Sequence, residues 1–304
     1  MITIHEVEEL KKNFESQVFL NEKLSNYSWF NLGGPAQILF KPKTLEDLSR
    51  FLKTINQKYK IKVLGVGSNT LIRDGGYDGI ILKLGSSFSR LSLLNSSTLI
   101  AGASALDKQV SNYALNNSLS EFEFLSCIPG SVGGAVRMNS GCYGYDISKI
   151  LVSVQAIDLS GNIKVIKASE INFSYRGSNL DDNLIFVSAT FKGKKNKKID
   201  IEKKINTLVE KKKKSQPSKI KTCGSTFKNP LNKKAWKLIK DSGCSEMSIG
   251  GAKMSEKHCN FFVNTGKAKS KELENLINKV KDIVLKKTGV NLELEIHIIG
   301  FDYE

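Results

Sequence analysis

Two glycine-rich turns, each beside an apolar segment typical of a strand, constrain this chain more than any other feature. The first reads GVGSN at residues 65–69 and follows the apolar segment 61–64; the second reads PGSVGGA at 129–135. Glycine lets a backbone approach a ligand closely and turns N–H groups toward phosphate oxygens. The first turn is not the dinucleotide fingerprint, because Thr70 stands where Gly-x-Gly-x-x-Gly has its third glycine. Alone it is explained equally well as a tight turn; together the two turns indicate a nucleotide-phosphate site.

Apolar periodicities along the chain predict the fold class. Helical and strand patterns follow one another without a strict strand–helix–strand order, which predicts an α+β fold. Ser104 with Asp107 resembles a helix cap, and so does Thr44 with its neighbours. Near the end, apolar residues at 292, 294, 296 and 298 alternate with polar ones, which predicts a strand with Glu295 on its polar face.

Two further segments carry polar groups suited to a catalytic site. The loop 223–230 reads CGSTFKNP and presents Ser225, but no His/Asp arrangement around it supports a hydrolase triad. Lysine supplies most of the positive charge, so a retained arginine suggests a need for its planar, bidentate fork. Two of the arginines lie in or near motifs, Arg137 and Arg176. The complete set is Arg50, Arg73, Arg90, Arg137 and Arg176.

The formal net charge of +16 raises the question of nucleic-acid binding. Ten of these charges come from residues 192–221, which hold thirteen lysines and three acids. No aromatic residues interleave with the lysines, and no nucleic-acid-binding module is recognisable. We therefore expect a solvated helix face and no nucleic-acid partner. A weak attraction for anionic nucleotide substrates is the alternative.

The cysteine content and the hydropathy of the chain indicate the cellular compartment in which it functions. The five cysteines are odd in number and contain no Cys-x-x-Cys pair, so we expect free thiols, no disulfide framework and no metal site. No apolar run reaches the length of about 18 residues that a membrane span needs. Residues 1–6 lack the pattern of a secretory signal. These features predict a cytoplasmic protein with no membrane partner.

In their order, these motifs resemble those of the UDP-N-acetylenolpyruvoylglucosamine reductases, the flavoenzymes that make UDP-N-acetylmuramate for peptidoglycan. The similarity extends from about Trp29 to Gly300. It includes GGPA at 33–36, YR at 175–176, GSTFKNP at 224–230, GGAK at 250–253, HCNF at 258–261 and LEI at 294–296. One subclass has an inserted loop with a substrate-gating tyrosine; here residues 175–176 lead directly to the strand-like segment 184–191. The chain therefore resembles the shorter subclass.

The resemblance implies an FAD-binding fold of the vanillyl-alcohol-oxidase/PCMH type with a C-terminal α+β substrate domain. We expect the FAD-binding region at 1–200, as two subdomains of about 1–60 and 61–200. The substrate-binding domain is expected at 201–304, with its last strand returning toward the active site. It also implies non-covalent FAD, NADPH as co-substrate and UDP-N-acetylglucosamine enolpyruvate as substrate. No histidine that could tether the flavin covalently occurs between residues 6 and 257.

The resemblance assigns roles to individual positions. Arg176 would hold developing negative charge, Ser225 would donate a proton, and Glu295 would orient and polarise the intermediate. The substrate-binding positions are Arg176, Lys228, Asn229 and His258. The FAD-binding positions are Gly65, Val66, Gly67, Ser68, Asn69, Thr70, Gly130, Ser131, Val132, Gly133, Gly134 and Asn139.

One position departs from the family pattern. His297 stands two residues after Glu295, where the family often has arginine, and histidine lacks the bidentate fork. How the substrate carboxylate is held is therefore open, although the reaction type is not affected. Two other interpretations remain: an FAD-linked oxidase of a small alcohol or sugar on the same fold, and a non-enzymatic nucleotide-binding protein with a basic face. A flavin spectrum would exclude the second.

Overall fold

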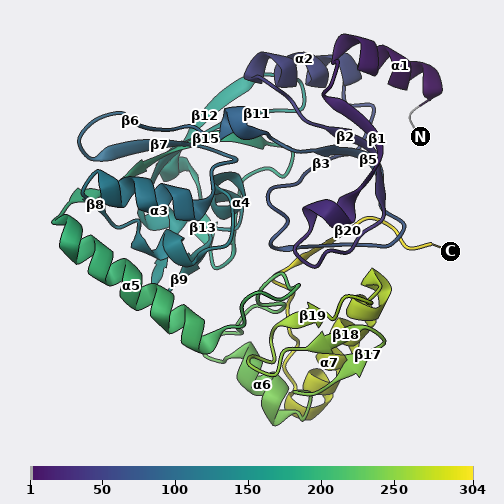
Figure 1. The fold of residues 1–304 in the computed structure, drawn as a ribbon, viewed down its shortest axis with the longest axis vertical. Helices are drawn as coiled ribbons and strands as arrows, with labels where there is room; N and C mark the ends of the chain where they lie inside the picture. The colour runs from purple at the N-terminus through teal and green to yellow at the C-terminus, as the bar shows by residue number, and fades with distance from the viewer. Residues whose placement is uncertain (1–2, 304) are drawn as a thin grey trace. The chain divides into compact units, whose positions relative to one another are not determined.

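The computed structural model describes residues 3–303 and contains helices and mostly short strands (Figure 1). Met1 and Ile2, from the segment expected to lack a secretory signal, and Glu304 lie outside the described residues. The chain forms two compact units. The first unit comprises Met1–Phe19, Leu39–Gly65 and Ile80–Lys212; the second comprises Leu20–Ile38, Val66–Gly79 and Lys213–Glu304. Mostly antiparallel strand pairs with interspersed helices confirm the α+β class.

The first unit contains a five-stranded antiparallel sheet in the order β12-β11-β15-β7-β6. The strands are β6 (Leu91–Leu93), β7 (Thr98–Gly102), β11 (Leu151–Ile157), β12 (Ile163–Lys167) and β15 (Ile185–Lys192). The β11–β12 hairpin brings Ile157 opposite Ile163, and the turn residues Ser160, Gly161 and Asn162 lie between the two strands. Strands β11 and β15 are largely buried, and Leu151, Val154, Phe186 and Phe191 from these strands belong to the core of this unit.

Two helices complete this core, α3 (Asp107–Asn116) and α4 (Val132–Arg137), which lie beside the sheet in Figure 1. The cap predicted at Ser104 is wrong: α3 begins at Asp107, and the Ser104 hydroxyl donates to the carbonyl of Gly85 at 2.6 Å. Asp107 is instead fully buried, and burial raises the pKa of its carboxyl well above its usual range. The Ser104 hydroxyl binds a carbonyl that is distant in the sequence, and no local sequence pattern could indicate that partner.

A second sheet has the order β1-β2-β5-β3, with β3 and β5 parallel. Its strands are β1 (Val18–Lys23), β2 (Pro35–Phe40), β3 (Ile61–Val63) and β5 (Tyr77–Leu82). Two helices accompany it, α1 (Ile4–Asn13) and α2 (Leu45–Ile55). The predicted cap of α2 is confirmed, because Thr44 Oγ1 accepts from the N–H of Asp47 at 3.1 Å. Three buried rings, Phe14, Phe40 and Phe51, pack together under these helices.

The lysine-rich segment forms α5 (Lys198–Ser215), and it is solvated on only part of its surface. Lys204 pairs with Glu123, whose side chain is only 3% exposed, at 3.3 Å. Lys212 Nζ donates to the carbonyl of Cys127 at 2.8 Å, and burial lowers its pKa. The expectation of a wholly solvated face is therefore wrong for these two lysines, whose long apolar stems let the ammonium groups reach polar partners.

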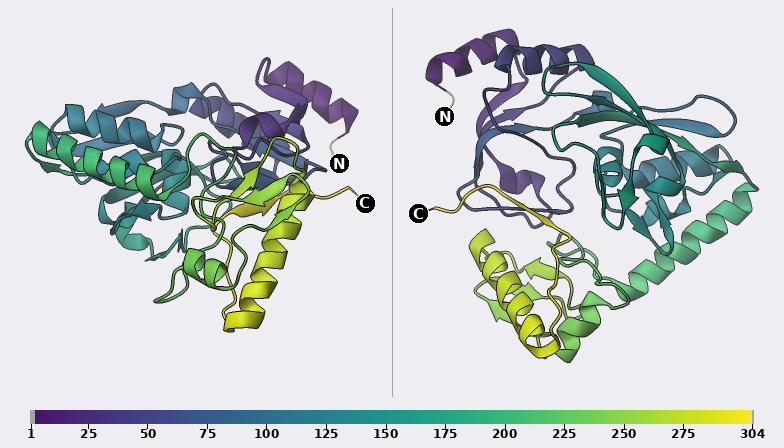
Figure 2. Two further views of the ribbon diagram at one scale, coloured as in Figure 1. Left: turned by 60° about the horizontal axis from the view of Figure 1, so that its bottom comes forward. Right: turned by 180° about the vertical axis from the view of Figure 1, so that it is seen from behind.

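The second unit has its own core under a three-stranded antiparallel sheet, β17 (Ser248–Ile249), β18 (Ala252–Met254) and β19 (Phe262–Asn264). Helix α7 (Ser270–Thr288) lies along these strands in both views of Figure 2, and α6 (Ala235–Asp241) packs on α7. Helix α7 ends at Gly289, which adopts the left-handed conformation (φ 70°) that favours glycine.

The last apolar segment only partly forms the predicted strand. Residues 292–296 make an isolated bridge at Leu294 and then bend, and the strand β20 is His297–Ile299. It runs parallel to β4 (Thr70–Ile72), with His297 opposite Thr70. The alternation is broken because the segment changes partner at the bend, from Phe227 to β4.

Short elements complete the chain. They are β8 (Leu119–Ser120), β9 (Gly141–Cys142), β10 (Tyr145–Asp146), β13 (Phe173–Ser174), β14 (Gly177–Ser178), β16 (Lys194–Lys195), η1 (Leu24–Tyr27), η2 (Ser86–Phe88), η3 (Glu123–Cys127), η4 (Ile147–Lys149) and η5 (Ala168–Glu170).

Candidate active-site segments

Gly65, the residue of the first glycine turn that belongs to the first unit, lies beside the second glycine turn. A Cβ added to Gly65 would lie 3.0 Å from Ser131 Oγ, which is closer than side chains normally approach. The ammonium of Lys83 donates to the carbonyl of Gly65 at 2.6 Å. Burial and the neighbouring charge of Lys41 lower the pKa of Lys83. Segments far apart in the sequence thus form one glycine-lined surface with a cation beside it, as an FAD pyrophosphate requires.

The residues of the second glycine turn differ in whether their backbone groups are available to a ligand. Val132 and Gly133 donate their N–H groups to the carbonyls of Ala105 and Ala103, at 2.9 and 2.8 Å. These two amides are committed to the backbone, so phosphate oxygens would need other groups. A Cβ on Gly134 would meet only Ser131 Oγ, at 3.9 Å, an ordinary contact. Internal packing therefore does not explain this glycine, whereas close approach of a ligand would.

Arg176 lies at the tip of a hairpin formed by β13 and β14, in which Ser174 pairs with Gly177. Its φ of 60° is in the left-handed region, which is unfavourable for a residue with a Cβ. A guanidinium nitrogen donates to the carbonyl of Gly141 at 3.0 Å, and the Tyr175 ring lies 5.0 Å away. Strained backbone of this kind often marks a functional position.

Asn139 connects α4 to this hairpin. Its side-chain amide donates to the carbonyl of Ser174 at 3.1 Å and accepts from the N–H of Ser148 at 3.0 Å. The side chain is buried, and both of its ends are engaged within the protein. In this structure Asn139 positions the segment that carries Arg176, and its contact with FAD stays a prediction.

The second unit holds the serine loop in register with two other segments. Ser225 forms a bridge with Phe261, and Phe227 forms one with Leu294. The N–H of Glu295 donates to the carbonyl of Thr226 at 2.8 Å. Ser225 and Glu295, 70 residues apart in the sequence, are therefore on backbone segments that are hydrogen-bonded to each other, and both side chains are partly exposed.

The first glycine turn contributes to this same group. The Asn69 amide donates to the carbonyl of Glu295 at 2.9 Å, and the N–H of His297 donates to the Asn69 carbonyl at 2.9 Å. The Cys223 thiol lies 3.4 Å from the carbonyl of Gly67. Residues 66–70, expected at the FAD, are thus fixed to the segments that carry Glu295 and Ser225.

The three remaining candidate substrate-binding residues, Lys228, Asn229 and His258, have different surroundings. Lys228 Nζ lies 3.5 Å from Glu293 Oε2. Asn229 Oδ1 accepts from the N–H of Ala235 at 3.0 Å, so it also caps the start of α6. His258 Nδ1 accepts from the N–H of Asn260 at 3.3 Å, and burial lowers the pKa of His258. His258 is accordingly neutral at neutral pH, with its proton on Nε2.

Two residues of these segments escaped the sequence interpretation. Lys83 directly follows β5 and belongs to none of the sequence motifs. Asn260 clamps the serine loop, accepting from the N–H of Phe227 at 3.0 Å and donating to its carbonyl at 2.8 Å. Its place in the segment HCNF was the only available signal, because the partner is 33 positions away.

Two other arginines, Arg137 and Arg73, use their guanidinium groups in contacts within the protein. Arg137 donates to the carbonyls of Leu180, Asp181 and Leu184. Arg73 forms a bidentate pair with Glu274 at 2.9 and 2.7 Å. The fork is thus used structurally at these two positions.

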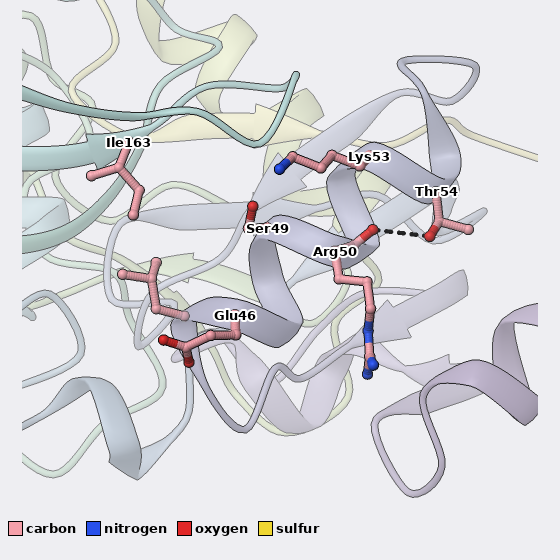
Figure 3. Close-up of a pocket in the computed structure, with 7 residues that line it drawn as sticks. Glu46, Ser49, Arg50, Lys53, Thr54 and Ile163 are labelled. Carbon is pink, nitrogen blue, oxygen red and sulfur yellow. Dashed lines mark hydrogen bonds between the residues drawn. The ribbon is translucent and has the colours of Figure 1, made fainter.

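A hollow of about 630 Å³ lies beside α2, next to the start of β12 (Figure 3). Glu46, Ser49, Arg50 and Lys53 from α2 line it together with Ile163. None of the candidate residues above contributes to it. Within residues 3–303, no cluster of His, Cys, Asp and Glu suits a metal ion, and no helix is long and apolar enough to cross a membrane.

Two protein-family models and several curated relatives match this chain. A model of an FAD binding domain matches residues 36–167, and the UDP-N-acetylenolpyruvoylglucosamine reductase C-terminal domain matches 216–299. A UDP-N-acetylenolpyruvoylglucosamine reductase of Pelagibacter ubique is 47% identical over 98% of this chain and 100% of its own length. One from Rickettsia massiliae is 44% identical over 91% of this chain and 94% of its own length.

A solved structure gives the same result at the level of the fold. The crystal structure of the UDP-N-acetylenolpyruvylglucosamine reductase from Thermus caldophilus has a TM-score of 0.81 and 31% identity, and the match covers 93% of this chain and 98% of that one. The expected FAD-binding fold is confirmed by this likeness and by the family model. The chain belongs to the UDP-N-acetylenolpyruvoylglucosamine reductase family.

Proposed function

We propose that this protein reduces UDP-N-acetylglucosamine enolpyruvate to UDP-N-acetylmuramate with NADPH, in the cytoplasmic synthesis of peptidoglycan precursors. The observation that carries the proposal is the hydrogen bond that joins the serine loop to the Glu295 segment, at 2.8 Å between Glu295 N and Thr226 O. It brings a hydroxyl and a carboxylate onto neighbouring backbone segments, in a chain whose relatives bear the name of this reductase.

The residues present suit FAD. Gly134 leaves room for close approach, and Lys83 supplies positive charge beside Gly65. We propose that FAD is held without a covalent bond by residues 65–70, 130–134 and 139, within a region spanning 1–200, and that residues 201–304 form the substrate-binding domain. Bound FAD would supply hydride-transfer chemistry between NADPH and the methylene carbon of the enolpyruvyl group.

Ser225 then donates a proton to the neighbouring carbon, which carries the carboxylate. A serine hydroxyl is a weak acid, so this step needs a strongly basic carbon and a fixed donor. The pairing of Ser225 with Phe261 and the clamp by Asn260 on Phe227 supply the fixed position.

Arg176 would bind the substrate carboxylate, where negative charge accumulates during the reaction. Glu295 would orient and polarise the intermediate. His297 replaces the arginine that the family often has, so we propose that bidentate binding of the carboxylate falls to Arg176. Lys228, Asn229 and neutral His258 would contact the substrate.

The test is an NADPH oxidation assay with and without UDP-N-acetylglucosamine enolpyruvate, with the product identified by mass. We expect absorbance loss at the NADPH band only with the substrate, and a product heavier by two hydrogens. The oxidase alternative is tested on the same preparation by oxygen uptake with small alcohols and sugars. Turnover in that assay, without reduction of the enolpyruvyl substrate, would replace the proposal.

A further inference from the structure

One of the two tryptophans of the chain is exposed on α6, beside the candidate substrate-binding residues. The Trp236 indole is 41% exposed, although tryptophan side chains are on average highly buried in folded proteins. Helix α6 buries Ala235 and Ile239 instead. Among the described residues, the core of the second unit and the side chains packed against it do not include Trp236. Packing within this unit therefore does not explain the indole, whereas contact with a ligand would.

A row of rings leads from Trp236 to the serine loop. The ring centroids of Trp236 and His258 are 6.4 Å apart, at an interplanar angle of 57°. The His258 ring lies 4.8 Å from the ring of Phe261, which is buried. Phe261 is in turn the bridge partner of Ser225. The exposed indole and the candidate proton donor thus lie at the two ends of one continuous set of contacts within the second unit.

The backbone that carries Trp236 is fixed to two neighbouring segments. Asn229 Oδ1 accepts from the N–H of Ala235 at 3.0 Å, which joins the start of α6 to the serine loop. The Cys259 thiol donates to the Trp236 carbonyl at 2.9 Å, which joins α6 to the segment that carries His258. An aromatic side chain on a fixed backbone offers a large contact area, and little conformational entropy is lost when a ligand stacks on it.

The ligand expected at this unit contains a flat ring. The proposed substrate is a uridine diphosphate sugar, in which a diphosphate joins the uracil base to the sugar that bears the reacting group. Nucleotide bases stack on aromatic side chains through their π faces. Positive charge near the start of α6 suits the diphosphate, and it comes from the exposed lysines Lys233, Lys234 and Lys237.

We propose that Trp236 is a specificity residue for the nucleotide end of the substrate, whose uracil ring stacks on the exposed indole. The identity of the ligand rests on the proposed function. The contact binds the substrate without taking part in the chemistry. Replacement of Trp236 should therefore raise KM for the enolpyruvyl substrate and leave kcat nearly unchanged.

The experiment measures binding to the flavin-loaded protein by titration calorimetry, with UDP and with dihydro-UDP, whose reduced base is puckered and no longer aromatic. The wild-type protein should bind UDP more tightly than dihydro-UDP by about tenfold, within the range that base stacking supplies. Trp236→Leu keeps an apolar side chain without a π face, and it should bind both ligands equally weakly. Trp236→Phe should retain part of the preference. Trp29→Leu, at the other exposed tryptophan, is the matched control and should keep the full preference.

Equal binding of UDP and dihydro-UDP by the wild-type protein would overturn the inference, whether or not the variants fold. NADP⁺ is titrated in parallel, and a loss in Trp236→Leu confined to NADP⁺ would assign the indole to the adenine of the co-substrate and overturn it as well. An equal loss of preference in Trp29→Leu would show that the effect is not specific to Trp236, with the same consequence. If UDP behaves as expected but the protein does not reduce the enolpyruvyl substrate with NADPH, the proposed function fails and the base site stands.

Discussion

Ser225 and Arg176 are held in different ways, and this difference shapes what their replacement should do. Ser225 lies in a loop that is paired on both sides, so removal of its hydroxyl leaves the backbone in place. Arg176 lies at a hairpin tip with positive φ, where the backbone itself is strained. Kinetics therefore test the first residue, and kinetics together with stability test the second.

Ser225→Ala should separate the two half-reactions. NADPH should still bleach the flavin at the wild-type rate, because that step needs no proton from the hydroxyl. Reoxidation by the enolpyruvyl substrate should slow by about 10²-fold or more, as expected for loss of a positioned general acid. Stopped-flow absorbance at the flavin band measures each half. Ser218→Ala, at an exposed serine, is the control; equal slowing of both halves would make Ser225 a structural residue instead.

At Arg176, glycine and alanine form a matched pair. Both remove the guanidinium and should greatly raise KM for the enolpyruvyl substrate. Only alanine keeps a Cβ at φ 60°, so Arg176→Gly should be more stable than Arg176→Ala by about 1 kcal/mol. Urea unfolding midpoints give the difference. Equal stabilities would show that the backbone relaxes, and the strain argument would then fail.

The lowered pKa of His258 predicts that the free energy of unfolding depends on pH. Burial lowers its pKa in the folded state, while the unfolded chain keeps a value of about 6.5. Below that pH the unfolded state binds a proton more readily, so stability is present above it and is lost as the pH falls through the folded pKa. His258→Gln should lose less stability than the wild type between pH 7 and 5 in urea titrations. His5→Gln, at an exposed histidine, should behave as the wild type does.

At the scale of elements, α5 is fixed to the first unit by lysines that interact with η3. Lys204 neutralises Glu123, whose carboxylate is nearly inaccessible to water and also accepts from the N–H of Glu121 at 2.9 Å. Lys212 binds the end of η3 through the Cys127 carbonyl. A helix that composition describes as a charged surface thus supports the segment leading into the second glycine turn.

Lys204→Ala should therefore destabilise the protein, because it leaves a buried carboxylate without its cation. We expect a loss of about 1–3 kcal/mol in the free energy of unfolding. Lys203→Ala removes the same charge from an exposed position and should stay within about 0.5 kcal/mol of the wild type. Both are measured by urea unfolding at one ionic strength. Equal losses would mean that helix propensity, and not the ion pair, is responsible.

For the whole molecule, the net charge of +16 does not by itself make a nucleic-acid-binding protein. Several lysines of α5 are engaged with carbonyls, a carboxylate or aromatic rings, such as Lys211 with Tyr143 at 4.9 Å. We expect weak binding of duplex and single-stranded DNA at low salt that disappears near physiological salt. Fluorescence anisotropy across a salt series measures it. Tight binding that persists at physiological salt would restore the alternative of a nucleic-acid partner.

The sequence by itself determined the class of the fold and most of its elements. The cap at Thr44, the hairpin at 151–167 and the end of α7 at Gly289 are local patterns, and local chemistry decides them. Ser104 and the final strand were predicted less well, because their partners, Gly85, Phe227 and β4, come from distant segments. Local periodicity contains no information about such pairings.

The same division applies to the candidate site. Glycine motifs, a scarce arginine and their resemblance to a family were sufficient to name Gly65, Arg176, Ser225 and Glu295. Only the tertiary structure decided that Gly65 meets Ser131, that Asn69 donates to the Glu295 carbonyl, and that the Thr226 and Glu295 backbones pair. The sequence carries the residue types that the chemistry needs. The distances between them depend on long-range backbone hydrogen bonds and packing, which arise only when the chain folds.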